Sequence, residues 1–409
     1  MNDFTPELRR DLEFFPARHQ GQQLILIRDQ LGLVQEGKAV AALLYRFMVL
    51  LNGDRTIRDL QVELMRQKGG SLVDTDEVKK LLAYLDESYL LDSGRFKEAR
   101  DKIVADFASG KVRPCSHCGA AYPDDPLKLK ERLDEILNRQ SSGPDPEGMV
   151  TALVSPHIDL SVGDQVYSRA YQVIKNRAPS RIVLLGAGHQ MAGDLFCLTD
   201  KDFQTPLGTI KNEQFQINKL REAGGDIIAH NDFAHRSEHS IEFQLIFLQH
   251  LLSGTPFTII PILCGSMAAL SEYKRDAFID RAGSFLNELS LLLRDQEQET
   301  LLVAGVDLSH TGPKFGHEVP ALYLQGQSET HDRNLLDGLS RMDAVHFWEE
   351  SIRVKDQFNV CGFSALACLL EILPPSMGEI LDYQIWHEEA TRSAVSFAAV
   401  AFTSVLIEP

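Results

Sequence analysis

The sequence predicts an α/β protein whose main domain has a mainly parallel central sheet and is preceded by a small α+β domain. Two short, continuously apolar and β-branched runs, at residues 152–154 and 182–185, are typical of buried strands. Apolar residues recur at helical spacing between them, so the three segments form a βαβ unit. The first hundred residues show short strands followed by helices, and a new composition begins near Cys115 after a charged stretch. We therefore expect a small domain at 1–98, a linker at 99–112 and a main domain at 113–409.

Composition and charge exclude several functional classes. The 409 residues carry a net charge of -17, which argues against a surface that binds nucleic acid. The N-terminus MNDFTPELRR lacks a signal-peptide pattern, and the longest apolar run, at 395–407, is shorter than the roughly 18 residues of a membrane span. We expect a soluble, cytoplasmic protein with no nucleic-acid and no membrane partner. Six cysteines are too few for a disulfide scaffold, so clustered cysteines indicate metal or catalytic chemistry.

The small domain is expected to begin with strands and continue with helices. Short strands are expected at 24–27 and 33–34, and helices at 39–51, from Thr56 onward, and at 76–88. Thr56 suits a helix N-cap because Asp59 stands three residues later, as in a capping box. This order gives the domain its α+β class.

The run LLNGDRT at 50–56 and the order of these elements resemble the winged-helix fold of PqqD-like peptide chaperones. The resemblance implies a peptide-docking domain, and we expect an extended segment to add at the sheet edge near 24–27. A winged helix can also bind DNA. Residues 1–100 hold 15 Lys and Arg against 16 Asp and Glu, so no basic excess supports that alternative.

Two cysteines stand close together at the start of the main domain. Cys115 and Cys118 have the C-x-x-C spacing found in zinc sites. A zinc ribbon needs four ligands in two knuckles, and no second pair follows nearby, so we favour a packed or solvent-facing turn over zinc. Their role stays open. An amphipathic helix is expected next, at 127–137.

Three histidines follow predicted strands of the main domain. His157 and His189 stand just after the two strands of the βαβ unit, and His310 follows a strand at 301–306, with Asp307 three residues before it. In an open parallel sheet, functional groups gather at the carboxyl ends of the strands. We therefore expect these side chains to share one crevice.

The sharpest competing motif is H-x-x-E-H at His235, Glu238 and His239, the signature of inverted zinc peptidases. That chemistry needs both histidines on one helix. Ser237 has the position of a helix N-cap, which leaves His235 outside the helix, so a metal-dependent hydrolase is a minor alternative. The structural alternative to a catalytic role for Glu238 and Glu242 is that they are acids in a first helical turn, favoured by the helix dipole.

A fourth candidate ligand comes from the C-terminal part of the chain. Cys361 opens a helix expected at 363–370, and a thiolate in a first helical turn is stabilised, which suits a metal ligand or a nucleophile. Cys197, Cys264 and Cys368 stand in apolar contexts. We expect these three to be small packed side chains.

Eight spaced motifs together resemble one family. The segments SPHIDL, LLGAGHQ, TPLGTI, EHSIE, FTIIPIL, GVDLSH, NVCG and VSFAAVAF resemble the Memo family, in the form of protein B of the AmmeMemoRadiSam system, over about residues 113–408. The resemblance implies a fold like the class III extradiol dioxygenases, with one metal ion held by His157, His189 and Cys361. Asp307 and His310 would lie beside the metal. Glu238 and His239 are possible residues of the layer around the ligands.

The ligand set departs from that of the dioxygenases, which hold ferrous iron with two histidines and a glutamate. Iron (Fe2+) remains the expected cofactor. Copper becomes possible because a thiolate at Cys361 is softer than a carboxylate. The resemblance also implies a radical SAM protein and an AMMECR-type protein as partners. A peptide is a possible substrate.

Two functional classes stay open after this comparison of motifs. One is a redox or oxygenase-like enzyme, and the other is a non-catalytic metal-binding adaptor that docks a peptide or protein partner. In the enzyme, His310 is the expected acid/base group and Asp307 holds its orientation. The alternative is that Asp307 and His310 only pair to satisfy buried polar atoms.

Overall fold

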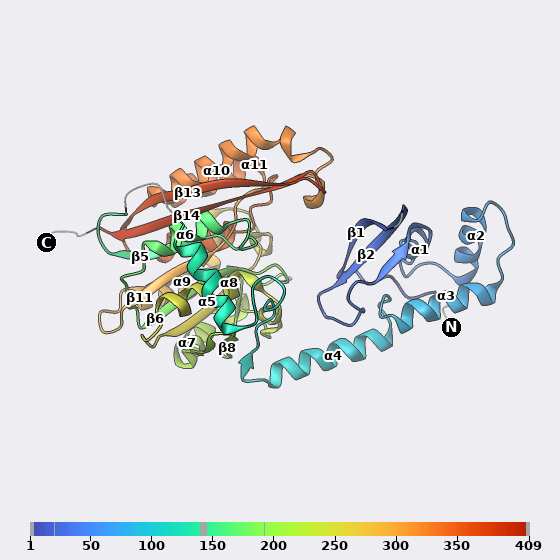
Figure 1. Cartoon of the computed structure of the whole chain (residues 1–409), viewed down its shortest axis with the longest axis horizontal. Helices are drawn as coiled ribbons and strands as arrows, with labels where there is room; N and C mark the ends of the chain where they lie inside the picture. The colour runs from blue at the N-terminus through green and yellow to red at the C-terminus, as the bar shows by residue number, and fades with distance from the viewer. Residues whose placement is uncertain (1–3, 20, 140–144, 192, 406–409) are drawn as a thin grey trace. The chain divides into compact units, whose positions relative to one another are not determined.

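The structure is a computed structural model that describes residues 4–19, 21–139, 145–191 and 193–405 (Figure 1). The chain divides into two compact units, Met1–Ser109 and Gly110–Pro409. Among the described residues, no helix has both the length and the apolar character needed to span a membrane. Each unit has a hydrophobic core of its own.

The first unit combines a small antiparallel sheet with helices. Its strands are β1 (Leu12–His19), β2 (Gln22–Asp29) and β3 (Ala39–Ala41), in the order β1-β2-β3. The helices are α1 (Ala42–Met48), α2 (Ile57–Gln67), α3 (Thr75–Glu87) and α4 (Gly94–Ser109). Thr56 caps α2 and forms the expected capping box with Asp59.

Two expectations for this sheet are wrong. Residues 33–34 are not a strand, because the Asp29 carboxylate accepts the backbone N–H groups of Leu31, Leu33 and Val34 and holds them in a turn. The segment 24–27 is not an edge, because it lies in β2 between β1 and β3. Two strands were missed from the sequence. β1 contains Pro16, which suits an edge strand and weakens the strand pattern, and β3 takes the first three residues of the helix expected at 39–51.

The second unit is built on a large mixed sheet. Its strands are β4 (Val112–Arg113), β5 (Val150–Ser155), β6 (Arg181–Ala187), β7 (Phe196–Leu198), β8 (Asp202–Thr205), β9 (Gly208–Asn212), β10 (Thr258–Cys264), β11 (Thr300–Gly305), β12 (His310–Thr311), β13 (Ser376–Glu388) and β14 (Ser393–Ser404). The main path runs β12-β14-β5-β11-β6-β10-β9-β8-β4. Its centre, β5-β11-β6-β10, is parallel, as expected.

Helices cover both faces of this sheet (Figure 1). One layer holds α5 (Pro126–Leu137), α6 (Asp164–Gln172) and α8 (His239–Leu251). The other holds α7 (Gln214–Gly224), α9 (Arg275–Leu293), α10 (Gln325–Ser340), α11 (Ala344–Val354) and α12 (Phe363–Ile372). Short 3-10 turns lie at Gly225–Ile227, Phe233–Arg236, Met267–Ala269, Pro313–Phe315 and Ala321–Tyr323.

The strand order decides which residues meet. The predicted βαβ unit of β5, α6 and β6 is present, but β11 lies between its two strands and pairs in parallel with both. The carboxyl ends of three adjacent parallel strands therefore lie side by side. The segments that follow them begin with Pro156, Gly188 and Val306.

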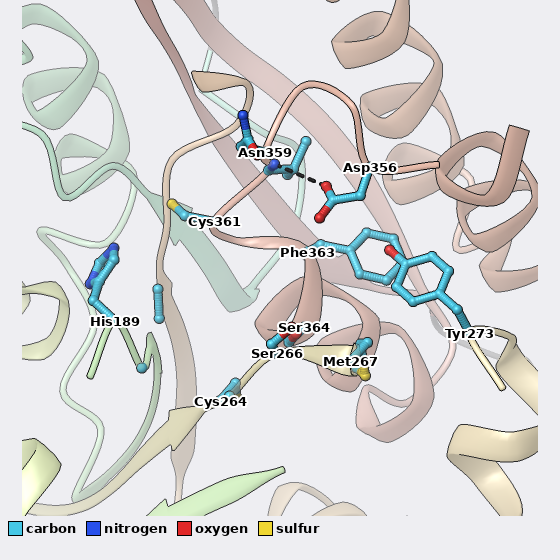
Figure 2. A pocket seen from close by; sticks show the side chains of 14 residues that line it. His189, Cys264, Ser266, Met267, Tyr273, Asp356, Asn359, Cys361, Phe363 and Ser364 are labelled. Carbon is cyan, nitrogen blue, oxygen red and sulfur yellow. Dashed lines mark hydrogen bonds between the residues drawn. The ribbon is translucent and has the colours of Figure 1, made fainter. Parts of the chain in front are cut away.

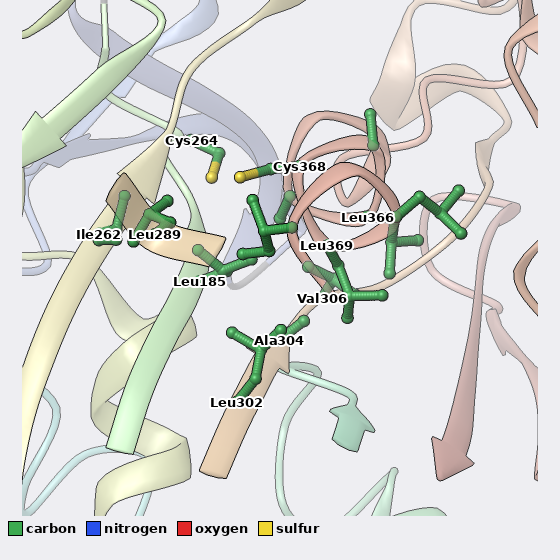
Figure 3. Close-up of a cluster of buried hydrophobic side chains, with 14 of the residues drawn as sticks. Leu185, Ile262, Cys264, Leu289, Leu302, Ala304, Val306, Leu366, Cys368 and Leu369 are labelled. Atoms are coloured by element: carbon green, nitrogen blue, oxygen red, sulfur yellow. The ribbon is translucent and has the colours of Figure 1, made fainter. Parts of the chain in front are cut away.

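The core beneath α12 contains two of the cysteines expected to be packed. Cys264 and Cys368 are buried, and their sulfur atoms point toward one another among aliphatic side chains (Figure 3). Cys197 is buried in β7. The structure thus confirms all three as packed side chains.

Candidate metal centre

His157 follows β5 and is almost fully buried. Its backbone N–H donates to Asp307 Oδ1 at 3.0 Å, and its Nδ1 lies 3.0 Å from the carbonyl oxygen of Gly305. Because a carbonyl oxygen only accepts, Nδ1 carries the proton and Nε2 carries the lone pair. Burial, together with the neighbouring charges of His239 and His189, holds the pKa of His157 well below its ordinary value. The side chain therefore presents a neutral imidazole, which is the form that binds a metal.

His189 follows β6 and is held by one acid. Its backbone N–H and its Nδ1 both lie 3.1 Å from carboxylate oxygens of Glu238. Burial disfavours the charged ring, but hydrogen bonds to Cys361 and Glu238 outweigh it and raise the pKa of His189 well above its usual range. A carboxylate on Nδ1 fixes the tautomer and leaves Nε2 as the atom that would bind a metal.

Glu238 is the N-cap of α8, where its side chain accepts the N–H groups of His239 and Ser240. The expected cap at Ser237 is therefore wrong by one residue. The reason is that the Glu238 carboxylate can serve the helix terminus and His189 together. Hydrogen bonds from His189 and His239 overcome burial and keep the pKa of Glu238 well below its usual range.

His239 completes a cluster of three imidazole rings. Its ring centroid lies 5.0 Å from that of His157 and 5.2 Å from that of His189, with the second pair stacked. His235 is elsewhere, in the 3-10 turn before α8, with Nε2 3.0 Å from the carbonyl oxygen of Cys197. His235 and His239 of the H-x-x-E-H motif therefore lie at separate sites, which agrees with the expectation that His235 is outside the helix.

Two glycines allow α8 to come this close to the strand ends. A Cβ on Gly305 would lie 2.3 Å from the carbonyl oxygen of Ser240, and a Cβ on Gly186 would lie 2.5 Å from Ser240 Oγ. Any side chain on these strand residues would push the first turn of α8 away. Glycine at both positions thus sets the distance between Glu238 and the crevice.

Cys361 lies just before α12, whose N-cap is Gly362. The expectation of a cysteine inside the first helical turn is therefore wrong by two residues. Its Sγ lies 3.6 Å from His157 Nε2 and 3.5 Å from the carbonyl oxygen of Asp307. Burial raises the pKa of the Cys361 thiol, so a bound cation would be needed to favour the thiolate.

The ligand atoms of His157, His189 and Cys361 all lie within 4.8 Å of one another, and those of His189, Glu238 and His239 form a second such group. The first group fits a soft or borderline transition-metal ion, because it offers two imidazoles and one thiol. In the second group, Glu238 already bonds the Nδ1 atoms, so it suits the role of orienting the ligands.

Asp307 and His310 lie next to this cluster, but they are not paired as expected. His310 Nδ1 lies 2.9 Å from the carbonyl oxygen of Leu308, which therefore orients the ring, whereas Asp307 accepts from the backbone of His157. The Asp307 carboxylate is instead taken up by the backbone of His157, which follows the neighbouring strand β5. Burial lowers the pKa of His310 to about 4 and raises the pKa of Asp307.

A cavity of about 270 Å³ opens beside the candidate ligands. Figure 2 shows His189 and Cys361 at one end, Tyr273 at the other, and Phe363 between them. Asp356 and Asn359, which also line it, have φ angles of 52° and 50°. Left-handed backbone at residues other than glycine is strained and is often retained at functional sites.

Comparison with known proteins gives this geometry a context. The family model described as Memo-like protein matches residues 113–401. The chain belongs to the Memo family. A MEMO1 family protein of Aquifex aeolicus is 31% identical over 402 residues, which cover 97% of this chain and 100% of the relative. A MEMO1 family protein of Thermus thermophilus is 27% identical, covering 83% and 97%, and the protein memo-1 homolog of Caenorhabditis elegans is 24% identical, covering 64% and 71%.

The Memo-like unit also contains a buried network that the sequence did not reveal. Glu242 accepts hydrogen bonds from Arg113, from the Tyr122 hydroxyl and from the backbone N–H groups of Ser116 and His117. Arg113 and Glu242 are both fully buried. Glu242 lies in the first turn of α8, as expected, but it is buried and bonded to this network, so its role goes beyond that of a helix-dipole acid. The signal in the sequence was an acid on an otherwise apolar helix.

The structure also answers what becomes of the C-x-x-C pair. Cys115 and Cys118 form a disulfide. Neither belongs to the groups of potential metal ligands found among the described residues. Both cysteines are half-buried around a bend at Ser116 and His117, and the covalent bond between them was not expected.

Proposed function

We propose that the Memo-like unit binds one transition-metal ion through His157, His189 and Cys361 and acts in a redox, oxygenase-like reaction. The observation that supports this best is the convergence of the three ligand atoms within 4.8 Å. The Nδ1 atoms of both imidazoles are already occupied, by Gly305 and Glu238. Iron is our first choice of metal and copper the second, since a thiolate suits both. When bound, either ion would supply one-electron chemistry and polarise an oxygen-containing ligand.

The protein's own groups could handle protons beside this centre. His310 is neutral at pH 7 because burial lowers its pKa to about 4, and its Nδ1 is bonded to Leu308. Its Nε2 is therefore the atom that would accept and return a proton. Asp307 Oδ2, 3.7 Å from His157 Nε2, adds a buried carboxyl group near the ligands. The cavity past Cys361 would hold the substrate against Phe363.

Metal analysis tests the ligand assignment. Full-length protein purified without oxygen should contain close to one iron or copper per chain. Cys361→Ser should lower metal affinity without unfolding the protein, because the change replaces only a soft ligand atom. Cys368→Ala, which alters a buried thiol in α12, is the matched control and should keep the metal. Full metal content in a Cys361→Ser, His189→Ala double variant would rule the assignment out.

Oxygen uptake tests the enzymatic part of the proposal. The iron-loaded protein should consume oxygen when a phenolic or peptide substrate is supplied. Uptake should depend on His310 and should be absent from metal-free protein. If the metal binds tightly but no candidate substrate raises the rate, the non-catalytic adaptor becomes the better description.

We also propose that the first unit docks an extended peptide, presented to a radical SAM protein and an AMMECR-type protein. Support comes from β1, which in the described part of the chain pairs with β2 alone and so leaves its other edge for a further strand. Titration of the full chain with an extended peptide should give saturable binding. A proline at exposed Arg18 should weaken it, because Arg18 has the same alternation as Pro16 and its N–H faces away from β2. Salt-sensitive binding of duplex DNA with no peptide binding would contradict it.

A further inference from the structure

The disulfide between Cys115 and Cys118 has the properties of a reactive bond. Both cysteines are half-buried, so an external thiol can reach them, whereas Cys197, Cys264 and Cys368 are buried. The C-x-x-C spacing is that of thiol–disulfide exchange sites. A disulfide that closes so short a loop adds little stability, because loop-closure entropy grows with the length of the loop. A purely structural purpose is therefore poorly served.

The loop that carries the disulfide is fastened to α8. The backbone N–H groups of Ser116 and His117 donate to the Glu242 carboxylate at 3.0 Å and 2.9 Å. On the N-terminal side, the fully buried Arg113 pairs with Glu242. On the C-terminal side, the Gly119 N–H donates to the carbonyl oxygen of Tyr122 at 2.7 Å. The two residues between the cysteines are thus bonded through their backbones to Glu242, so a change at the disulfide acts directly on this bonded turn.

One of those residues contacts the histidine cluster. The His117 ring centroid lies 5.5 Å from that of His239 and 5.8 Å from that of Phe243. The His239 ring lies 5.0 Å from that of His157. A single side chain therefore separates the disulfide loop from a candidate metal ligand.

We propose that Cys115 and Cys118 are a redox-active pair that exchanges with a dithiol and whose state sets the position of His117 against His239. In the exchange, a thiolate of the external dithiol attacks one sulfur and forms a mixed disulfide, and the other cysteine leaves as a thiolate and takes up a proton. The second external thiol then releases the first cysteine. The external dithiol is oxidised to a disulfide by two electrons, and the protein disulfide is reduced to two thiols.

Reduction removes the bond that closes the loop, and the two thiols then separate from the roughly 2.05 Å of a covalent S–S bond to van der Waals distance. Ser116 and His117 lie between the two cysteines, so this separation acts on their backbone hydrogen bonds to Glu242. The inference needs no metal at the histidine cluster, so its outcome is independent of the proposed metal binding.

The test uses metal-free, full-length protein equilibrated without oxygen in a series of glutathione redox buffers, with a thioredoxin-type dithiol protein as catalyst. Free thiols are alkylated and located by mass spectrometry. Cys115 and Cys118 should become alkylated together in one two-electron transition, while buried Cys197 stays protected as an internal control. Nitrogen-15 histidine spectra of the same samples should show the His117 and His239 ring signals shifting on reduction.

His346, on α11 in the opposite helical layer, should keep its ring signals unchanged in those spectra. A folded Cys115→Ser, Cys118→Ser double variant should give the reduced pattern in every buffer. Reduced wild-type protein makes the same comparison if that variant does not fold. The proposal is overturned if the disulfide resists reduction until the protein unfolds, or if reduction leaves the His117 and His239 signals in place. Stoichiometric zinc binding by the reduced pair would also overturn it, because the cysteines would then form a metal site.

Discussion

Replacing Glu242 by glutamine tests whether the buried network beside the histidine cluster holds the Memo-like unit together. The carboxylate offers four lone-pair sites to donors from Arg113, Ser116, His117 and Tyr122, whereas a glutamine oxygen offers two. Glutamine also removes the only charge that balances Arg113 in this network, and both side chains are 0% exposed. Removing one partner of such a buried pair costs about 3–5 kcal/mol, so Glu242→Gln should lose roughly that much unfolding free energy at pH 7.

The loss should depend on pH in a defined direction. Burial favours the neutral acid, but hydrogen bonds from His117 and Tyr122 and the charge of Arg113 hold the pKa of Glu242 well below its ordinary 4.5. A carboxyl group with a lowered pKa contributes stability above its unfolded-state pKa and loses it as the pH falls through the folded-state value. The difference between wild type and variant should therefore be constant above pH 4.5 and shrink below it.

Urea unfolding followed by tryptophan fluorescence measures this loss of unfolding free energy in the Memo-like unit. Both tryptophans, Trp348 and Trp386, lie in the second unit, so the signal reports on that unit. Glu349→Gln, a change to an exposed acid of α11, is the control and should stay within about 0.5 kcal/mol of wild type. A loss below about 1 kcal/mol, or a difference that persists unchanged to pH 3, would refute the reasoning from a charged buried network.

Three further predictions concern the candidate centre and the first unit. Glu238→Gln should weaken metal binding about 10- to 100-fold by equilibrium titration while one metal per chain still binds, since glutamine keeps an acceptor oxygen for the N-terminus of α8 but loses the carboxylate behind His189; unchanged affinity would contradict that role. His310→Gln should keep metal and stability but lose roughly 10²- to 10⁴-fold in oxygen-dependent turnover; full turnover would exclude it as acid/base. Arg9→Ala should lower the unfolding free energy of the first unit by about 3–5 kcal/mol, measured by hydrogen exchange of β2, because Arg9 and Asp29 are fully buried partners. Arg10→Ala, a change to an exposed residue, should be nearly neutral, and equal effects of the two changes would contradict this prediction.

Much of the candidate site was accessible from the sequence because it follows strand ends. Apolar, β-branched runs identified β5, β6 and β11, and in a parallel sheet the residues after such strands must meet at one edge. That rule alone brings His157 and His189 together. Cys361 needed the motif resemblance as well, since it precedes a helix more than 200 residues from His157 in the sequence.

The hydrogen-bond partners of the site residues could not be predicted from the sequence in the same way. Asp307 was expected to bond His310, three residues along the chain, but it bonds the backbone of His157. Glu238 has both of the roles considered for it, since it caps α8 and holds His189. The error over Asp307 has a physical cause: local spacing describes neighbours in the chain, whereas a buried polar group bonds whichever partner the packing brings within reach.

By itself, therefore, the sequence determined the α/β class and the central strands, because these depend on periodicity, and its motif resemblance implied the three side chains that could hold a metal. Only the tertiary structure decided the tautomers of the histidines, the place of His239 in the cluster and the Arg113–Glu242 network. It also decided that Cys115 and Cys118 bond to each other. The histidine cluster depends on the insertion of β11 between β5 and β6 and on glycines that let α8 approach the strand ends, and no short stretch of sequence records such distances.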